Sequence, residues 1–208
     1  MGPTNASIRV RATIVWIVLA AATIGPIAAA AWSPLVAWRG PAYIVACFAG
    51  IAALCLLLFQ PLLASGMIPG ISRQQARTTH QWVGGALVLA VVAHVGGLWI
   101  TSPPDVIDAL LLRSPTPFSA WGVIAMWALF ISAAFAAFRM RLRIGLRFWR
   151  LVHRLLATVI VGGTVVHALL IEGMMETVSK AGLCLLVLIA TLRAMARVTG
   201  SRAHNRAE

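Results

Sequence analysis

Four histidines stand out because they recur at one spacing within apolar sequence. HQWVGGALVLAVVAH places His80 and His94 fourteen residues apart, and HRLLATVIVGGTVVH places His153 and His167 at the same spacing. Fourteen residues make almost four helical turns, so each pair lies on one helix face, about 21 Å apart along the axis. An ionisable side chain inside a membrane span is costly and by default marks a functional site. Two neutral imidazoles that face one another could bind haem iron as axial ligands.

A simpler explanation is that each histidine is a buried polar group satisfied by its neighbours. That explanation suits one histidine, but it does not account for two equal spacings on two helices. Gly84, Gly97 and Gly163 lie within about one turn of a histidine. Both a flat porphyrin and close packing of membrane helices favour such small residues. The glycines alone leave these two interpretations open.

The composition places the histidines in a membrane protein. The chain is 61% hydrophobic and 11% charged, whereas a soluble domain carries about 25% charged residues. Its net charge of +12 comes from basic residues clustered between apolar spans, a pattern typical of membrane topology and not of nucleic-acid binding. Cys47, Cys55 and Cys184 fall within apolar spans and form no CxxC or CxxCH motif. Thiolate metal sites and covalent haem attachment therefore have no support.

The charge pattern divides the chain into six candidate spans, since a helix needs roughly 20 apolar residues to cross a bilayer. The spans are expected near residues 12–31, 41–64, 80–100, 118–138, 151–171 and 177–196. We predict an all-α integral membrane bundle of six transmembrane helices, with no internal repeat. The first apolar run is longer than a usual signal-peptide core, which favours a retained span. We expect a single membrane domain, 1–208, that comprises a first span and outer loop (1–40), a candidate haem-binding core with the four histidines (41–198) and a polar tail (199–208).

Most of the seventeen basic residues fall on one side of this bundle. The positive-inside rule assigns that side to the cytoplasm, and both termini with it. The two spans that carry the histidines then run in the same direction. His80 and His153 therefore share the inner level of the membrane, and His94 and His167 share the outer level.

The two histidine segments resemble the paired haem-ligand helices of the ferric reductase-like transmembrane domain family. That family includes ferric reductases, NADPH oxidases and the haem subunit of the bacterial periplasmic methionine sulfoxide reductase system. The segment IGLRFWRLVH, which ends at His153, also resembles the approach to the fifth span in bacterial members. The resemblance covers roughly residues 40–196. It implies two haem b groups, with His80 and His153 bound to the inner iron and His94 and His167 bound to the outer iron.

The resemblance further implies a transmembrane electron-transfer cytochrome b, an oxidoreductase component. Ferric reductases and NADPH oxidases carry a cytoplasmic flavin and nicotinamide domain after the sixth span, whereas only a short polar tail follows it here. We therefore expect a separate electron donor, either a cytoplasmic flavin reductase with its bound flavin or a membrane quinol. The outer acceptor would be a ferric chelate, oxygen or a periplasmic reductase. The alternatives are the haem subunit of a periplasmic methionine sulfoxide reductase system and, in a different class, a haem-free transporter or structural membrane protein.

Three secondary features bear on partners and location. The connection RMRLRIGLRFWRLVHR is densely basic, as expected for a topology determinant, a docking surface for an acidic reductase, or a site that neutralises haem propionates. Gln60 and Pro61 place a polar group and a helix break near the inner end of the second span, where a quinone could bind. The excess of arginine over lysine indicates a GC-rich bacterial genome, and hence a bacterial inner membrane. Tryptophans near span ends are expected as interfacial anchors: Trp32, Trp38, Trp99, Trp121 and Trp149.

Overall fold

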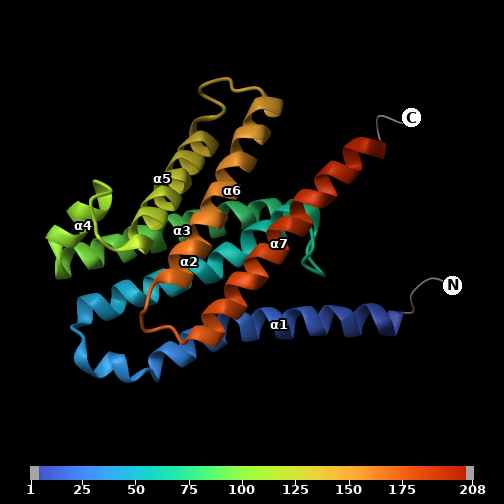
Figure 1. Cartoon of the computed structure of the whole chain (residues 1–208). Coiled ribbons are helices and arrows are strands. Elements are labelled where there is room, and N and C mark those ends of the chain that lie inside the picture. The colour runs from blue at the N-terminus through green and yellow to red at the C-terminus, as the bar shows by residue number, and fades with distance from the viewer. Residues whose placement is uncertain (1–4, 205–208) are drawn as a thin grey trace.

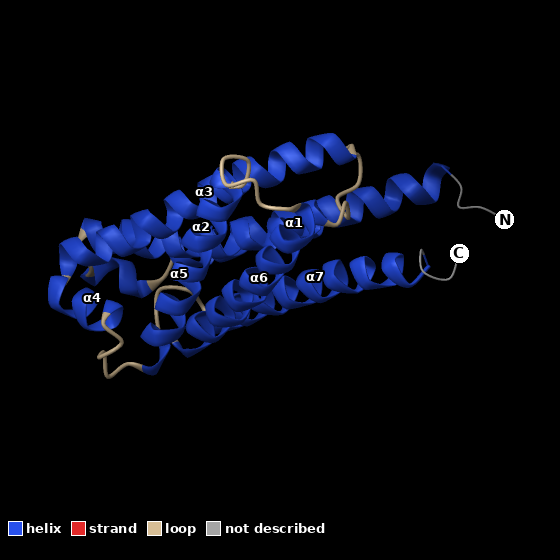
Figure 2. Ribbon diagram, turned by 90° about the horizontal axis from the view of Figure 1, so that it is seen from above, coloured by secondary structure: helices blue, strands red, loops and turns tan. Residues whose placement is uncertain are grey.

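The computed structural model describes residues 5–204, and all regular structure in that range is helical (Figures 1 and 2). In chain order the elements are α1 (Asn5–Ala31), the short 3-10 helix η1 (Pro34–Trp38), α2 (Pro41–Ala64), α3 (Arg73–Thr101), α4 (Pro103–Leu110), α5 (Pro117–Phe138), α6 (Leu146–Leu170) and α7 (Thr177–His204). The predicted all-α fold is confirmed. Residues 199–204 of the expected polar tail continue α7, and residues 205–208 lie outside the described range.

Within the described residues, six helices are long and apolar enough to cross a membrane, as predicted. They cover Arg9–Ala31, Pro41–Ala64, Arg73–Thr101, Pro117–Phe138, Leu146–Leu170 and Thr177–Arg197. The largest difference is at α3, which begins seven residues before the expected start at residue 80. A capping box explains the extension, because Ser72 Oγ accepts a hydrogen bond from the Gln75 N–H while Gln75 Oε1 accepts one from the Ser72 N–H.

The connection after α3 contains a helix that the sequence analysis missed. Ser102, Pro103 and Pro104 are residue types common in turns, but here the two prolines form the start of the eight-residue α4. Proline is well suited to the first helical turn because its missing N–H has no partner there in any case. The Ser102 hydroxyl also donates to the carboxylate of Asp105 at 2.6 Å. Proline therefore begins a helix here and does not exclude one.

The spanning helices form two antiparallel hairpins, α2–α3 and α5–α6, whose members pack closely on each other. Helix α7 packs against α2 and α6, and α1 packs against α2 and α7 (Figure 1). The largest fully buried side chains lie where α7 meets this bundle, at Leu183, Cys184 and Val187. The two hairpins are thus joined by α7, and each histidine-bearing helix packs mainly on the helix that precedes it in its own hairpin.

The connection between α6 and α7 is fixed at both ends. Glu176 caps α7, since its carboxylate accepts hydrogen bonds from the N–H groups of Ser179 and Val178. These bonds hold the pKa of the Glu176 carboxyl below its ordinary value. Lys180 is buried, and its ammonium donates to the carbonyl of Ile171 at 2.8 Å, directly after α6. The end of α6 is therefore attached to the beginning of α7.

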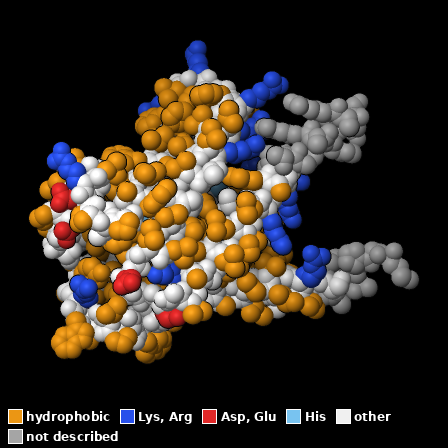
Figure 3. Space-filling model, in the orientation of Figure 1, with side chains coloured by type: hydrophobic (Ala, Val, Ile, Leu, Met, Phe, Trp, Pro, Cys, Tyr) orange, Lys and Arg blue, Asp and Glu red, His pale blue; other side chains and the backbone are white. Residues whose placement is uncertain are grey.

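The charged side chains are distributed unevenly over the molecule. Figure 3 shows Lys and Arg side chains mainly towards the end of the molecule where the chain termini lie, while the Asp and Glu side chains, with a few Lys and Arg beside them, lie towards the opposite end. At and just after the connection between α5 and α6, the basic end carries the half-buried Arg139 and three exposed arginines, Arg141, Arg143 and Arg147. The charge asymmetry expected from the sequence is therefore present in the folded chain.

Candidate functional site

In the first hairpin, both histidines of α3 are held by backbone carbonyl groups of α2. His80 Nδ1 lies 3.2 Å from the carbonyl oxygen of Gln60, and His94 Nδ1 lies 2.7 Å from that of Ala46. Because a carbonyl oxygen can only accept, each Nδ1 must carry the ring proton. Nε2 then keeps a free lone pair, which is the tautomer that a metal-binding histidine needs.

The second hairpin holds the histidines of α6 in the same way. His167 Nδ1 lies 2.8 Å from the carbonyl oxygen of Phe118, and His153 Nδ1 lies 2.9 Å from the hydroxyl oxygen of Ser132, both on α5. A hydroxyl can donate or accept, so it constrains the tautomer of His153 less strictly than a carbonyl would. All four sequence-predicted site residues thus engage Nδ1 with the preceding helix.

The two hairpins repeat one arrangement, although the sequence showed no repeat. The partners on α2, Ala46 and Gln60, are fourteen residues apart, and so are the partners on α5, Phe118 and Ser132. This is the same spacing as that of the histidines they contact. The two hairpins therefore share one arrangement of histidines and partners, which the sequence marks only through the spacing of the histidines. Three of the four partners are backbone carbonyls, which do not depend on the residue type. The partner positions therefore share no sequence pattern.

Two glycines missed by the sequence analysis make room for the outer rings. A Cβ atom added at Gly50 of α2 would lie 2.9 Å from His94 Nδ1, and one at Gly122 of α5 would lie 2.6 Å from His167 Nδ1. Real Cβ atoms essentially never approach so closely. Each glycine lies one turn after the carbonyl that its histidine contacts. This relation could be recognised only after that carbonyl was known.

The glycines singled out from the sequence have a different role. A Cβ at Gly97 would lie 2.8 Å from the Cβ of Ala46, and one at Gly163 would lie 2.9 Å from the carbonyl oxygen of Trp121. A Cβ at Gly84 would make only an ordinary van der Waals contact. Close helix packing within each hairpin therefore accounts for Gly97 and Gly163, which favours the second of the two open interpretations.

The structure brings His80 and His153 together across the gap between the hairpins. Their ring centroids are 6.2 Å apart and their planes are inclined at 75°. A metal-bound nitrogen lies about 2 Å from the ion and about 1 Å from its ring centre, so two imidazoles on opposite sides of one ion have centroids about 6 Å apart. The same separation also permits a direct edge-to-face contact between the rings. For the other expected pair, His94 and His167, the described residues show no such ring contact, and each ring is held within its own hairpin.

The four histidines suit a metal ion whose other ligands come from a bound cofactor. Among the described residues, no three or more His, Cys, Asp or Glu side chains form a candidate metal site. The histidines therefore offer two ligands at each level, which suits iron whose other four ligands come from a porphyrin.

The sequence-based expectation for Gln60 and Pro61 is partly wrong. Pro61 does not break α2, which continues to Ala64. The Gln60 side chain donates from Nε2 to the carbonyl oxygen of His80 at 3.4 Å, so both its backbone and its side chain contact that residue. The polar group that suggested a quinone pocket is instead engaged with a site histidine.

One of the expected interfacial tryptophans also contacts a site histidine. The rings of Trp149 and His153 are stacked, with centroids 5.0 Å apart and planes inclined at only 8°. The Arg139 guanidinium lies 5.3 Å from the centre of the Trp149 ring. The Trp149 indole N–H is buried without a hydrogen-bond partner. His153 is therefore supported by α5 through Ser132 and by its own helix through Trp149.

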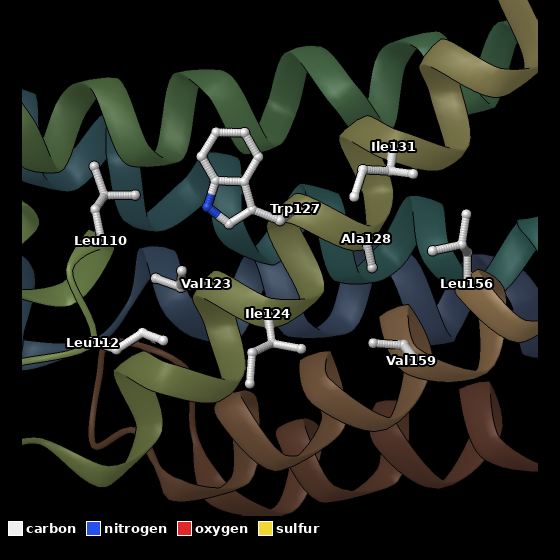
Figure 4. A pocket seen from close by; sticks show the side chains of 9 residues that line it. All are labelled: Leu110, Leu112, Val123, Ile124, Trp127, Ala128, Ile131, Leu156 and Val159. Carbon is white, nitrogen blue, oxygen red and sulfur yellow. The ribbon is translucent and has the colours of Figure 1, made fainter.

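An apolar cavity of about 350 Å³ lies beside this site, between the end of α4 and the helices α5 and α6 (Figure 4). Its lining contains no titratable or metal-binding side chain, so it offers no acid–base chemistry of its own. The residues around it are Leu110, Leu112, Val123, Ile124, Trp127, Ala128, Ile131, Leu156 and Val159.

A family model described as the ferric reductase like transmembrane component matches residues 49–164, more than half of the chain. The chain belongs to this family. The matched segment contains His80, His94 and His153, and it ends three residues before His167. Ferric reductase-like transmembrane domains generally bind haem, and membership points to electron transfer in a membrane. Together with the six apolar helices, it identifies an integral membrane protein. No curated protein and no solved structure matches the chain.

Proposed function

We propose that this ferric reductase-like protein is a transmembrane cytochrome b that carries electrons through two bis-histidine haem b groups. His80 and His153 would bind the inner haem iron, and His94 and His167 the outer one. When bound, haem iron supplies reversible one-electron chemistry. The observation that carries the proposal is that all four histidines engage Nδ1 with the preceding helix, which leaves Nε2 available at both levels.

The protein's own part would be to hold the four rings in place. A hydrogen bond at Nδ1 fixes the orientation of an imidazole and raises its basicity as a ligand. Because each partner lies on a helix of the same hairpin, the ring cannot turn without breaking that bond. The two levels lie about 21 Å apart along the helix axis. Buried aliphatic side chains between them, including Leu87 and Ile160, exclude water from this depth.

The basic end of the molecule supports a direction for electron flow. We propose that this end, with both termini, faces the cytoplasm of a bacterium and that the protein lies in the inner membrane. A cytoplasmic flavin reductase with an acidic surface would be steered to the exposed arginines between α5 and α6. The electron acceptor, a ferric chelate or a periplasmic reductase such as a methionine sulfoxide reductase, would bind at the opposite end.

A visible spectrum of the purified full-length protein tests the proposed function. On reduction with dithionite, we expect the sharp α band of a low-spin b-type cytochrome. The variants His80→Ala and His94→Ala should each lose part of that band, while Gly85→Ala, which has open space around it, should keep all of it. A wild-type protein expressed with adequate haem supply that lacks the band would remove the proposal and favour a haem-free membrane protein.

A further inference from the structure

His153 differs from the other three histidines in the group that faces its Nδ1. The others contact backbone carbonyls, whereas His153 contacts the hydroxyl of Ser132 at 2.9 Å. Ser132 is only 5% exposed and is the buried polar residue of helix α5, whose other buried side chains are apolar. A buried hydroxyl is costly unless it is hydrogen-bonded, and this contact provides the bond. Residue 132 is therefore the one place in the four-histidine arrangement where a side chain, and not the backbone, sets the environment of Nδ1.

The plane of the His153 ring has independent support. Trp149 lies one turn earlier on α6 and stacks on the ring almost in parallel. Arg139, at the end of α5, covers the indole of Trp149 in turn. Loss of the Ser132 hydroxyl would leave this stack in place, so the ring would keep its packing and lose only the group at Nδ1.

We propose that Ser132 is a positioning residue that sets the midpoint potential of the inner haem through His153. This inference rests on the proposed function. If Nε2 binds iron, Nδ1 keeps its proton, and the Ser132 hydroxyl oxygen must accept a hydrogen bond from the Nδ1–H group. An acceptor at Nδ1 increases the electron density that the imidazole donates to the metal, which favours the oxidised iron. The inner haem then has one ligand supported by a carbonyl and one by the weaker hydroxyl acceptor, whereas both outer ligands are supported by carbonyls.

The test is a redox titration of the full-length protein, followed by its visible spectrum. In Ser132→Ala the acceptor is lost, so the reduced form of the inner haem should become more favourable. At a fixed ambient potential we expect the ratio of reduced to oxidised inner haem to rise at least threefold, where tenfold corresponds to 59 mV for one electron. The outer haem should titrate as in the wild type. The inner component is identified as the one that His80→Ala removes.

Three further variants separate this effect from a general loss of structure. Ser132→Thr keeps the hydroxyl and should retain the wild-type ratio. Ser132→Cys supplies a weaker acceptor and should shift the ratio in the same direction as alanine. Thr191→Ala is the matched control, because Thr191 is a buried hydroxyl on α7 that donates to the carbonyl of Val187 in its own helix. It should leave both haems unchanged.

Several outcomes would overturn the inference. One is a ratio of reduced to oxidised inner haem that stays at the wild-type value in Ser132→Ala or Ser132→Cys. Another is an equal shift in the midpoint potentials of both haems in Ser132→Ala. The third is a shift of comparable size in Thr191→Ala. Loss of the inner haem from both the alanine and the cysteine variants would show that Ser132 is required for binding, and would also contradict a potential-setting role. A wild-type protein without haem would overturn the proposed function itself. If the wild type contains haem but Ser132→Ala leaves the midpoint potential of the inner haem unchanged, only this inference is overturned.

Discussion

Each outer histidine depends on two features of the neighbouring helix, a carbonyl that accepts its N–H and a glycine that leaves space for its ring. For His94 these are the carbonyl of Ala46 and Gly50, and for His167 they are the carbonyl of Phe118 and Gly122. Among the described glycines, none lies against the rings of His80 and His153 in this way. The outer level is therefore the more sensitive to a single added methyl group on α2 or α5.

At the residue scale, we predict that Gly50→Ala and Gly122→Ala each displace one outer ring from its carbonyl. Haem content should fall by roughly half, with the outer spectral component lost and the inner one kept. Alanine is up to about 1 kcal/mol more favourable than glycine inside a helix, so helix propensity alone would predict a more stable protein with full haem content. Haem analysis of the two variants beside Gly85→Ala checks this. Full haem content in both would mean that the rings can move aside without losing the ligand.

Which features of the site can be predicted from the sequence, and which cannot, is clearest at the residue scale. Imidazole is a side chain, so the spacing of the four histidines could be read directly from the sequence. Their partners are mostly backbone carbonyls, which every residue possesses, so no residue type marks them. The roles of Gly50 and Gly122 follow from those carbonyls, and they were missed for the same reason. Gly97 and Gly163 were noticed because they lie near histidines, but they pack against the neighbouring helix.

At the scale of elements, the proposal is that the hairpins α2–α3 and α5–α6 present their histidines at two matched levels. His80 and His153 meet across the gap between the hairpins. We predict that His80→Ala and His153→Ala remove the same spectral component, and that His94→Ala and His167→Ala remove the other. Spectra and redox titrations of the four variants are the measurement. If His80→Ala instead matched His167→Ala, the pairing by depth would be wrong.

The connection between α5 and α6 supports a prediction about the donor. Arg141, Arg143 and Arg147 are exposed, whereas the half-buried Arg139 contacts Trp149, which stacks on His153. Replacing Arg141, Arg143 and Arg147 with Gln should slow reduction by a soluble flavin reductase several-fold at low salt, because electrostatic steering acts mainly on the association rate.

Two controls accompany the arginine variant. Haem content and the rate of reduction by dithionite, which needs no docking, should stay at wild-type values. High salt should remove most of the difference between the variant and the wild type. An unchanged rate at low salt would leave the arginines as determinants of topology only, and quinol would become the favoured donor.

At the scale of the whole molecule, length and apolar content were enough to predict six spans and most of their limits. The physical reason is that a bilayer imposes one helix length on every span. The differences arise outside the apolar core, where local hydrogen bonds decide. The Ser72–Gln75 capping box extends α3, and Ser102 with its two following prolines begins α4. Neither feature changes the apolar pattern from which the spans were predicted.

The central claim is that one chain holds two haems, one at each level of paired histidines. The most direct measurement is the molar ratio of haem to polypeptide, obtained by pyridine haemochrome analysis together with quantitative amino-acid analysis of the purified full-length protein. The account predicts a ratio approaching two, which falls to about one in His80→Ala and in His94→Ala. A reproducible wild-type ratio near one, left unchanged by either of these substitutions, would contradict it.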